Sequence, residues 1–458
     1  MDEYRQRRER RRRLRSRLLR VAAVVAALGM IAVYVFGGTA GAAPAHSAPA
    51  EDGPQPGPGQ WFMEDYGIPE LWETTRGEGV TVAVVDSGVK ADHENLTGKV
   101  KASRDFSGSG HDGTVPVGPE EIIHHGTAVA GVIAGNGSGA GPTGVAPEAE
   151  IASASVWLGA GGPSAAQSTR VQAQQALEWA VDSGASVVNM SLGWNDPAWP
   201  ESWDEAFAHA YAEDVVVIAC VGNRSQGASQ AWSPATVPGV VGVGGLGRSG
   251  EVRESSTAPG TAVDLMGPAE DIPVPYHDGG YGTADGCSFA APVISGIAAL
   301  LRSAHPEMSA DEVVAALTQT AGDVAGHEGR STAEEPDPIV GWGRVDPGAA
   351  LAWEPDGSEA SAAQQLEDWV RMHRRADAEA EAGAEGPADS PPSASGEADA
   401  DGEGTATGED EEPQVRAAAA PAARLGPALL VAGGVVSLGL LTAGGVGFLR
   451  IRRSSRRG

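Results

Sequence analysis

Residues 80–88 read Val-Thr-Val-Ala-Val-Val-Asp-Ser-Gly, and this stretch decides the fold class. Its first six residues form a short run that is rich in β-branched side chains and apolar on both faces. Such a run is typical of a strand buried inside a parallel sheet. The run ends at Asp86, and Ser87 and Gly88 follow as a turn. We therefore predict a buried strand with a carboxylate at its carboxyl end.

Similar apolar runs recur along the chain and alternate with helical patterns. The further strands are expected at residues 186–190, 215–219 and 240–243, and the helices at residues 169–183 and 288–305. Strands that alternate with helices indicate an α/β fold whose central, mostly parallel sheet is flanked by helices. Functional residues gather at the carboxyl ends of such strands, where Asp86, Ser191 and Asn223 stand.

Composition excludes several classes of protein. The chain has 458 residues and a formal net charge of −29, which argues against a nucleic-acid partner because phosphate binding needs an excess of Lys and Arg. Cys220 and Cys287 are the only cysteines. They are too few for a disulfide scaffold or for a zinc site of the usual four-ligand kind.

Both ends of the chain carry signals for a membrane. Residues 1–42 are expected to be a signal peptide, because an Arg-rich start precedes an apolar run at 21–36 and a small-residue cleavage site after Ala42. An uncleaved anchor is the alternative. Residues 425–449 are apolar and uncharged, and five arginines follow them, which predicts a single transmembrane helix with a basic cytoplasmic tail at 450–458.

These signals predict an exported domain held at the cell membrane. A Pro/Gly-rich lead-in at 43–60 would precede a folded domain at 61–353. Residues 354–424 are rich in Ala, Glu, Asp, Gly, Ser and Pro, which predicts an acidic, disordered tether. Within that tether, residues 366–375 could form a short helix.

Three motifs supply the residue types that nucleophilic hydrolysis of a peptide needs. Asp86 lies in Val-Val-Asp-Ser-Gly, His125 in His-His-Gly-Thr-Ala-Val-Ala-Gly, and Ser288 in Gly-Cys-Ser-Phe-Ala-Ala-Pro. A hydroxyl attacks, an imidazole accepts its proton, and a carboxylate holds that imidazole in the right tautomer. We expect a helix to begin at His125 and another to begin at Ser288, where free backbone N–H groups favour a developing negative charge.

With these motifs in this order, the chain resembles the subtilisin family of serine peptidases. The resemblance covers roughly residues 61–353 and implies the three-layer subtilisin-like fold and endopeptidase activity on protein or peptide substrates. It implies that Asp86, His125 and Ser288 form a catalytic triad and that Asn223 supplies the side-chain amide of the oxyanion hole. It also implies two pocket walls, Ser191-Leu192-Gly193 and Cys220-Val221-Gly222, which hold the substrate residue before the cleaved bond. These apolar walls favour a neutral or apolar residue there.

Some residues near these motifs are assigned no chemical role. We expect Cys220 and Cys287 to be small buried thiols; a disulfide, which needs Cα atoms within about 7 Å, is an open alternative. His124 is expected in a loop and His277 on the solvated surface.

Catalysis in the family needs no cofactor. Calcium stabilises many members, but no run here matches a specific calcium loop, so the metal sites are left unknown.

The order of segments resembles one branch of the family, the mycosins, which are peptidases of type VII secretion systems. This chain departs from them in having only two cysteines. Two functions are open. The first is an active endopeptidase that cuts exported or cell-surface proteins, as part of a type VII secretion machinery. The second is a catalytically silent, membrane-anchored structural subunit of a secretion complex.

Overall fold

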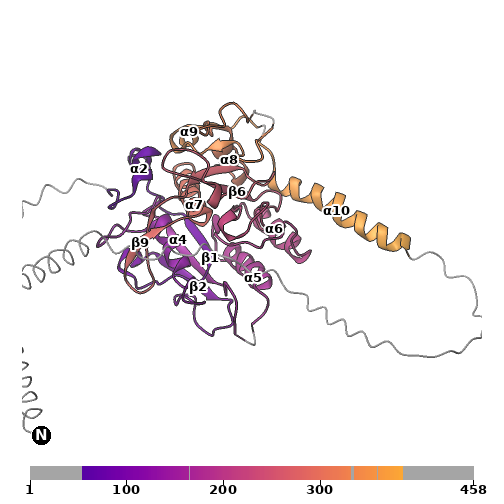
Figure 1. Ribbon diagram of the computed structural model, residues 1–458, viewed down its shortest axis with the longest axis horizontal. Helices are drawn as coiled ribbons and strands as arrows, with labels where there is room; N and C mark the ends of the chain where they lie inside the picture. The colour runs from indigo at the N-terminus through magenta and orange to yellow at the C-terminus, as the bar shows by residue number, and fades with distance from the viewer. Residues whose placement is uncertain (1–53, 164–165, 332–334, 358, 385–458) are drawn as a thin grey trace, which may run out of the picture. The chain divides into compact units, whose positions relative to one another are not determined.

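The computed structural model describes residues 54–163, 166–331, 335–357 and 359–384 (Figure 1). The signal peptide expected at 1–42, the transmembrane helix expected at 425–449 and the basic tail expected at 450–458 lie outside these residues.

A parallel sheet forms the centre of the described part. Its eight strands lie in the order β10-β7-β6-β5-β4-β1-β3-β2, and all neighbouring pairs are parallel. A separate antiparallel hairpin joins β8 to β9. The strands are β1 Thr81–Asp86, β2 Val100–Asp105, β3 Glu150–Ser155, β4 Val187–Met190, β5 Val216–Cys220, β6 Val241–Leu246, β7 Leu265–Pro268, β8 Ile272–Pro275, β9 Tyr281–Ala284 and β10 Gly343–Arg344.

Helices cover both faces of this sheet. Side chains of β1 alternate between two cores: Val82 and Val84 pack with α4, α7 and α8, whereas Ala83 and Val85 pack with α5 and α6. This is the three-layer α/β arrangement that the sequence predicts. The helices are α2 Trp61–Asp65, α3 Ile68–Leu71, α4 His125–Ala134, α5 Thr169–Asp182, α6 Ser202–Ala212, α7 Cys287–Ala304, α8 Ala310–Gln319, α9 Pro347–Leu351 and α10 Ala362–Ala384, with short 3₁₀ turns at Glu94–Leu96, Arg224–Gln226 and Glu254–Ser256.

The strands and helices expected from apolar periodicity are confirmed. The strands β1, β4 and β5 and the helices α5 and α7 begin and end within one residue of the predicted ranges, and β6 runs on to Leu246. The helix α7 is long and apolar enough to cross a membrane by composition, but it is buried in the domain and serves as a core helix.

The packed body extends beyond both predicted ends of the domain. At the amino end, the side chain of Gln60 exchanges two hydrogen bonds with the backbone of Thr143, at 2.7 and 2.8 Å. At the carboxyl end, Leu366 of α10 is buried against α6, and Arg374 pairs with Asp204 at 2.9 Å. Residues on both sides of the predicted range 61–353 therefore also contact the body.

Candidate active site

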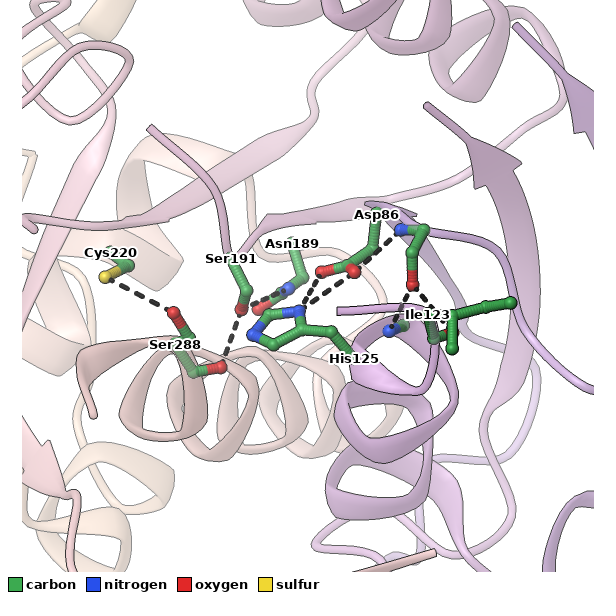
Figure 2. A network of polar contacts seen from close by, with 9 residues as sticks. Asp86, Ile123, His125, Asn189, Ser191, Cys220 and Ser288 are labelled. Atoms are coloured by element: carbon green, nitrogen blue, oxygen red, sulfur yellow. Dashed lines mark hydrogen bonds and ion pairs between the residues drawn. The ribbon is translucent and has the colours of Figure 1, made fainter. Parts of the chain in front are cut away.

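Asp86 and His125 meet where β1 ends and α4 begins. The Nδ1 atom of His125 lies 2.9 Å from both carboxylate oxygens of Asp86 (Figure 2). Both side chains are buried, at 0% and 2% exposed. A carboxylate that accepts from Nδ1 fixes the tautomer in which Nε2 is free to accept a proton.

Ser87 and Gly126 hold this pair in place. The hydroxyl of Ser87 accepts from the N–H of Gly126 at 3.0 Å and donates to the carbonyl of Ile123 at 3.2 Å, so it ties the turn after β1 to the start of α4. The N–H of Ser87 also donates to Asp86 at 2.7 Å. A methyl group on Gly126 would lie 2.5 Å from the carbonyl oxygen of Gly88, so only glycine fits there. These contacts fix the approach of the helix to the strand.

Ser288 lies in the first turn of α7, on the other side of the imidazole. Figure 2 shows the His125 ring between Asp86 and Ser288. The carbonyl of Ser288 accepts from the hydroxyl of Ser191 at 2.8 Å, while its own hydroxyl points to the sulfur of Cys220 at 3.8 Å. Among the described residues, Nε2 of His125 has no hydrogen-bond partner. The Ser288 hydroxyl thus stands in a rotamer that does not engage the imidazole.

Phe289 limits how the His125 ring can move. The two ring centroids lie 5.3 Å apart, and Phe289 is itself buried at 1% exposed. Packing on one side and the carboxylate on the other hold the imidazole at a fixed orientation. No motif in the sequence predicts this role of Phe289.

Cys220 and Cys287 form a disulfide, with their Cα atoms 5.2 Å apart. The expectation of two free thiols is therefore wrong. The fold brings the end of β5 next to the start of α7, and this proximity cannot be read from two positions 67 residues apart. The cross-link joins one predicted pocket wall to the residue before Ser288.

Asn223 also reaches the start of α7. Its side-chain oxygen accepts from the N–H of Cys287 at 3.1 Å, and its Nδ2 contacts Gln226 at 3.4 Å. The backbone N–H of Cys287 thus occupies the amide oxygen. The amide nitrogen carries two N–H donors, and one of them contacts Gln226. Asn223 therefore lies beside Cys287, the residue before Ser288.

The two predicted pocket walls run side by side. Ser191-Leu192-Gly193 continues β4 and Cys220-Val221-Gly222 continues β5, and these two strands pair in parallel. Ser191, Leu192 and Val221 are buried at 2% exposed or less. The side chains of these three residues are thus turned into the body of the protein and away from solvent.

Two further histidine rings border this centre. His124 precedes α4, and its ring packs on Tyr276 and His277 of the turn between β8 and β9, with centroids 4.9 and 5.9 Å away. Burial, followed by the nearby His277 and His125, lowers the pKa of His124. The sequence analysis predicts a loop position for His124 and a solvated position for His277, and the structure adds the contact between their rings.

Within the described ranges, no group of three or more His, Cys, Asp or Glu side chains is arranged to hold a metal ion. The chemistry available at this centre is that of a carboxylate, an imidazole, a hydroxyl and neighbouring N–H donors. That set is sufficient for nucleophilic acyl transfer.

Comparison with known proteins identifies the family. The family model of the subtilases, Peptidase S8, matches residues 77–343. The chain belongs to the subtilase family. This subtilase is 32% identical to subtilisin DY from Bacillus licheniformis over 265 residues, which cover 56% of the chain and 90% of that protein. The chain is thus a subtilisin-like serine endopeptidase.

Mycosins are also among the relatives of this subtilase. It is 32% identical to mycosin-3 from Mycobacterium tuberculosis over 373 residues, which cover 69% of the chain and 76% of that protein. The solved structure of the MycP3 protease from the type VII (ESX-3) secretion system aligns with a TM-score of 0.54 and 28% identity, covering 64% of this chain and 88% of that one. The protein is therefore a mycosin-type subtilase in sequence and fold.

Proposed function

We propose that this subtilase hydrolyses peptide bonds through a triad of Asp86, His125 and Ser288. Nε2 of His125 accepts the proton of the Ser288 hydroxyl as its oxygen attacks the substrate carbonyl, and then donates the proton to the leaving amine. A water molecule then attacks the resulting acyl-enzyme and gives a proton to Nε2. The ester bond breaks, the proton returns to the oxygen of Ser288, and the carboxylic acid product leaves. Asp86 stabilises the imidazolium that forms. The observation that carries the proposal is the contact of Nδ1 with both oxygens of Asp86. It leaves a buried Nε2 that faces Ser288 (Figure 2) and has no hydrogen-bond partner among the described residues.

The oxyanion that forms on the substrate would be bound by Asn223 and by the backbone N–H of Ser288. The helix α7 begins at Cys287, so the N–H of Ser288 is among the first-turn donors without an intrahelical acceptor. The hydrogen bond from Cys287 to the Asn223 oxygen supports this role because it orients the amide group. Removing one such donor typically costs about 3 kcal/mol of transition-state stabilisation.

Substrates would bind as an extended strand between the backbone edges of residues 191–193 and 220–222. Main-chain hydrogen bonds would supply affinity, and the residue before the cleaved bond would enter the space between the walls. No cofactor takes part in this reaction.

We place the enzyme at the cell membrane, with its catalytic domain outside and its substrates among exported or cell-surface proteins. The apolar segment 425–449 and the arginines after it would anchor it. The alignment with mycosin-3 is longer than the peptidase domain alone, which supports a place in a type VII secretion machinery. The basis for this part of the proposal is similarity of sequence.

A fluorophosphonate probe tests the catalytic proposal on the full chain in membranes. The wild-type protein should be labelled, and Ser288→Ala should abolish the labelling. Ser303→Ala is the matched control, since Ser303 lies near the carboxyl end of the same helix and its hydroxyl donates to the carbonyl of Glu78. Folded protein that shows no labelling dependent on Ser288 would rule the triad out. Unchanged secretion and cleavage in cells carrying Ser288→Ala would instead favour the silent structural subunit.

A further inference from the structure

A buried tryptophan, Trp232, connects the two segments assigned as pocket walls. Its N–H donates to the carbonyl of Val221 at 3.0 Å, in one wall. The next residue, Ser233, accepts from the N–H of Trp194 at 3.0 Å, directly after the other wall. Residues 232–233 therefore run between the two walls and hold them at a fixed separation.

The indole of Trp232 packs against the glycine of each wall. A methyl group added to Gly222 would lie 2.7 Å from Cδ2 and 2.8 Å from Cγ of the indole, and one added to Gly193 would lie 3.2 Å from its Cε3. Real Cβ atoms do not tolerate contacts as close as those at Gly222, so this wall accepts the ring only because it carries glycine there. One ring thus lies against the glycines of both walls.

The ring is held firmly in this position. Its Nε1–H donates to the side-chain oxygen of Asn195 at 2.9 Å, and the residue is 1% exposed. Within the described part of the chain, the buried apolar side chains that pack with it are those of Ala228 and Ala258. Moving the ring would break the hydrogen bond and open a large void in a close-packed region, which is costly.

We infer that Trp232 closes the pocket and restricts the residue before the cleaved bond to Gly, Ala or Ser. A larger side chain would have to occupy the volume that the indole fills. This inference rests on the proposed function, because it takes the substrate to bind between residues 191–193 and 220–222. It narrows the earlier expectation of any neutral or apolar residue to small ones.

Cleavage of peptides that differ at this one position tests the inference. For the wild-type enzyme, kcat/KM should be at least about 100-fold higher with Ala than with Phe or Leu. In Trp232→Gly the ratio should fall by about the same factor, because the vacated volume admits the larger side chain. Trp232→Leu keeps most of the packing, and its ratio of kcat/KM values should lie between those of the wild type and Trp232→Gly. This variant is the test to use if Trp232→Gly fails to fold.

Trp72→Leu is the matched control. Trp72 is also buried, at 5% exposed, but its Nε1–H donates to the carbonyl of Val145 and it packs in the other core of the domain. This variant should lose stability and keep the preference for Ala. A change of preference in this control would mean that loss of packing, and not the vacated pocket, alters specificity.

The outcomes separate the pocket from the catalytic proposal. Wild-type enzyme that is labelled at Ser288 but cleaves after Phe as fast as after Ala would overturn the inference and leave the proposed function intact. An unchanged ratio in Trp232→Leu would also overturn it. Folded protein that is neither labelled nor active would remove the proposed function and the inference with it.

Discussion

The hydroxyl oxygen of Ser288 lies 3.8 Å from the sulfur of Cys220, whose disulfide partner, Cys287, precedes that serine in the chain. The hydroxyl therefore points to the pocket wall, while Nε2 of His125 is left without a partner within the described residues. A change of rotamer about the Cα–Cβ bond of Ser288 would turn the hydroxyl toward the ring of His125. The backbone of Ser288 is held throughout by the hydroxyl of Ser191.

Removing the disulfide should affect both stability and turnover. The double variant Cys220→Ala and Cys287→Thr loses a cross-link over a separation of 67 residues, so we expect the free energy of unfolding to fall by about 2 to 4 kcal/mol. We also expect kcat to fall more than KM rises, because the start of α7 carries both Ser288 and the contact to Asn223. Urea unfolding and steady-state kinetics, without added reductant, measure the two effects. A variant with unchanged midpoint and kcat would show that the cross-link holds nothing at the site.

Asn223 can be tested by separating its two hydrogen-bonding groups. Asn223→Ala should lower kcat by about 10² to 10³ with little change in KM, because the lost donor acts on the transition state. Asn223→Asp keeps an oxygen for the N–H of Cys287 but has no amide donor, so its kcat should fall at least as far. Near-normal turnover of Asn223→Asp would indicate that the side chain only positions Cys287.

A second carboxylate, Asp264, should make stability depend on pH. Burial raises the pKa of Asp264 from 3.8 to about 7, although the N–H of Gly242 donates to it at 2.7 Å. The folded state therefore binds the proton of Asp264 more tightly than the unfolded state does. The stabilisation that comes from this protonation is complete below pH 3.8 and is lost as the pH rises through about 7.

Asp264→Asn removes that titration and keeps an oxygen for Gly242. We expect the variant to gain thermal stability relative to the wild type as the pH rises from 5 to 8, with the two proteins closest at the acid end. Comparing the pair at each pH cancels the titration of all other groups. A difference in melting temperature that stays constant over this range would contradict the prediction.

The sequence was informative wherever function depends on the end of a strand or the start of a helix. The β-branched run before Asp86 predicts its place at the sheet edge, and the small residues after His125 fit a helix that begins there. The three candidate catalytic residues could therefore be assigned to neighbouring elements before any coordinates. Their catalytic roles are still proposals that the experiments above test.

Contacts between segments far apart in the chain could not be predicted in this way. The disulfide depends on how close β5 and α7 approach, and the role of Trp232 depends on two glycines that meet one ring. Hydrophobic periodicity shows which face of an element is buried but not which partner covers it. The same limit applies to the tether predicted at 354–424, because its composition does not show that Leu366 packs against α6.

The helix α10 leaves the body beside α6 (Figure 1), and its first half acts as a cover. The ring of Trp369 lies 4.2 Å from that of Trp199, and the guanidinium of Arg374 lies over both rings. A shortened protein that stops at Trp353 would uncover Trp199 and leave Asp204 without its cation. The protein that stops at Trp353 would expose an aromatic surface and aggregate on purification. A protein that ends after Arg374 keeps this surface covered and would stay in solution.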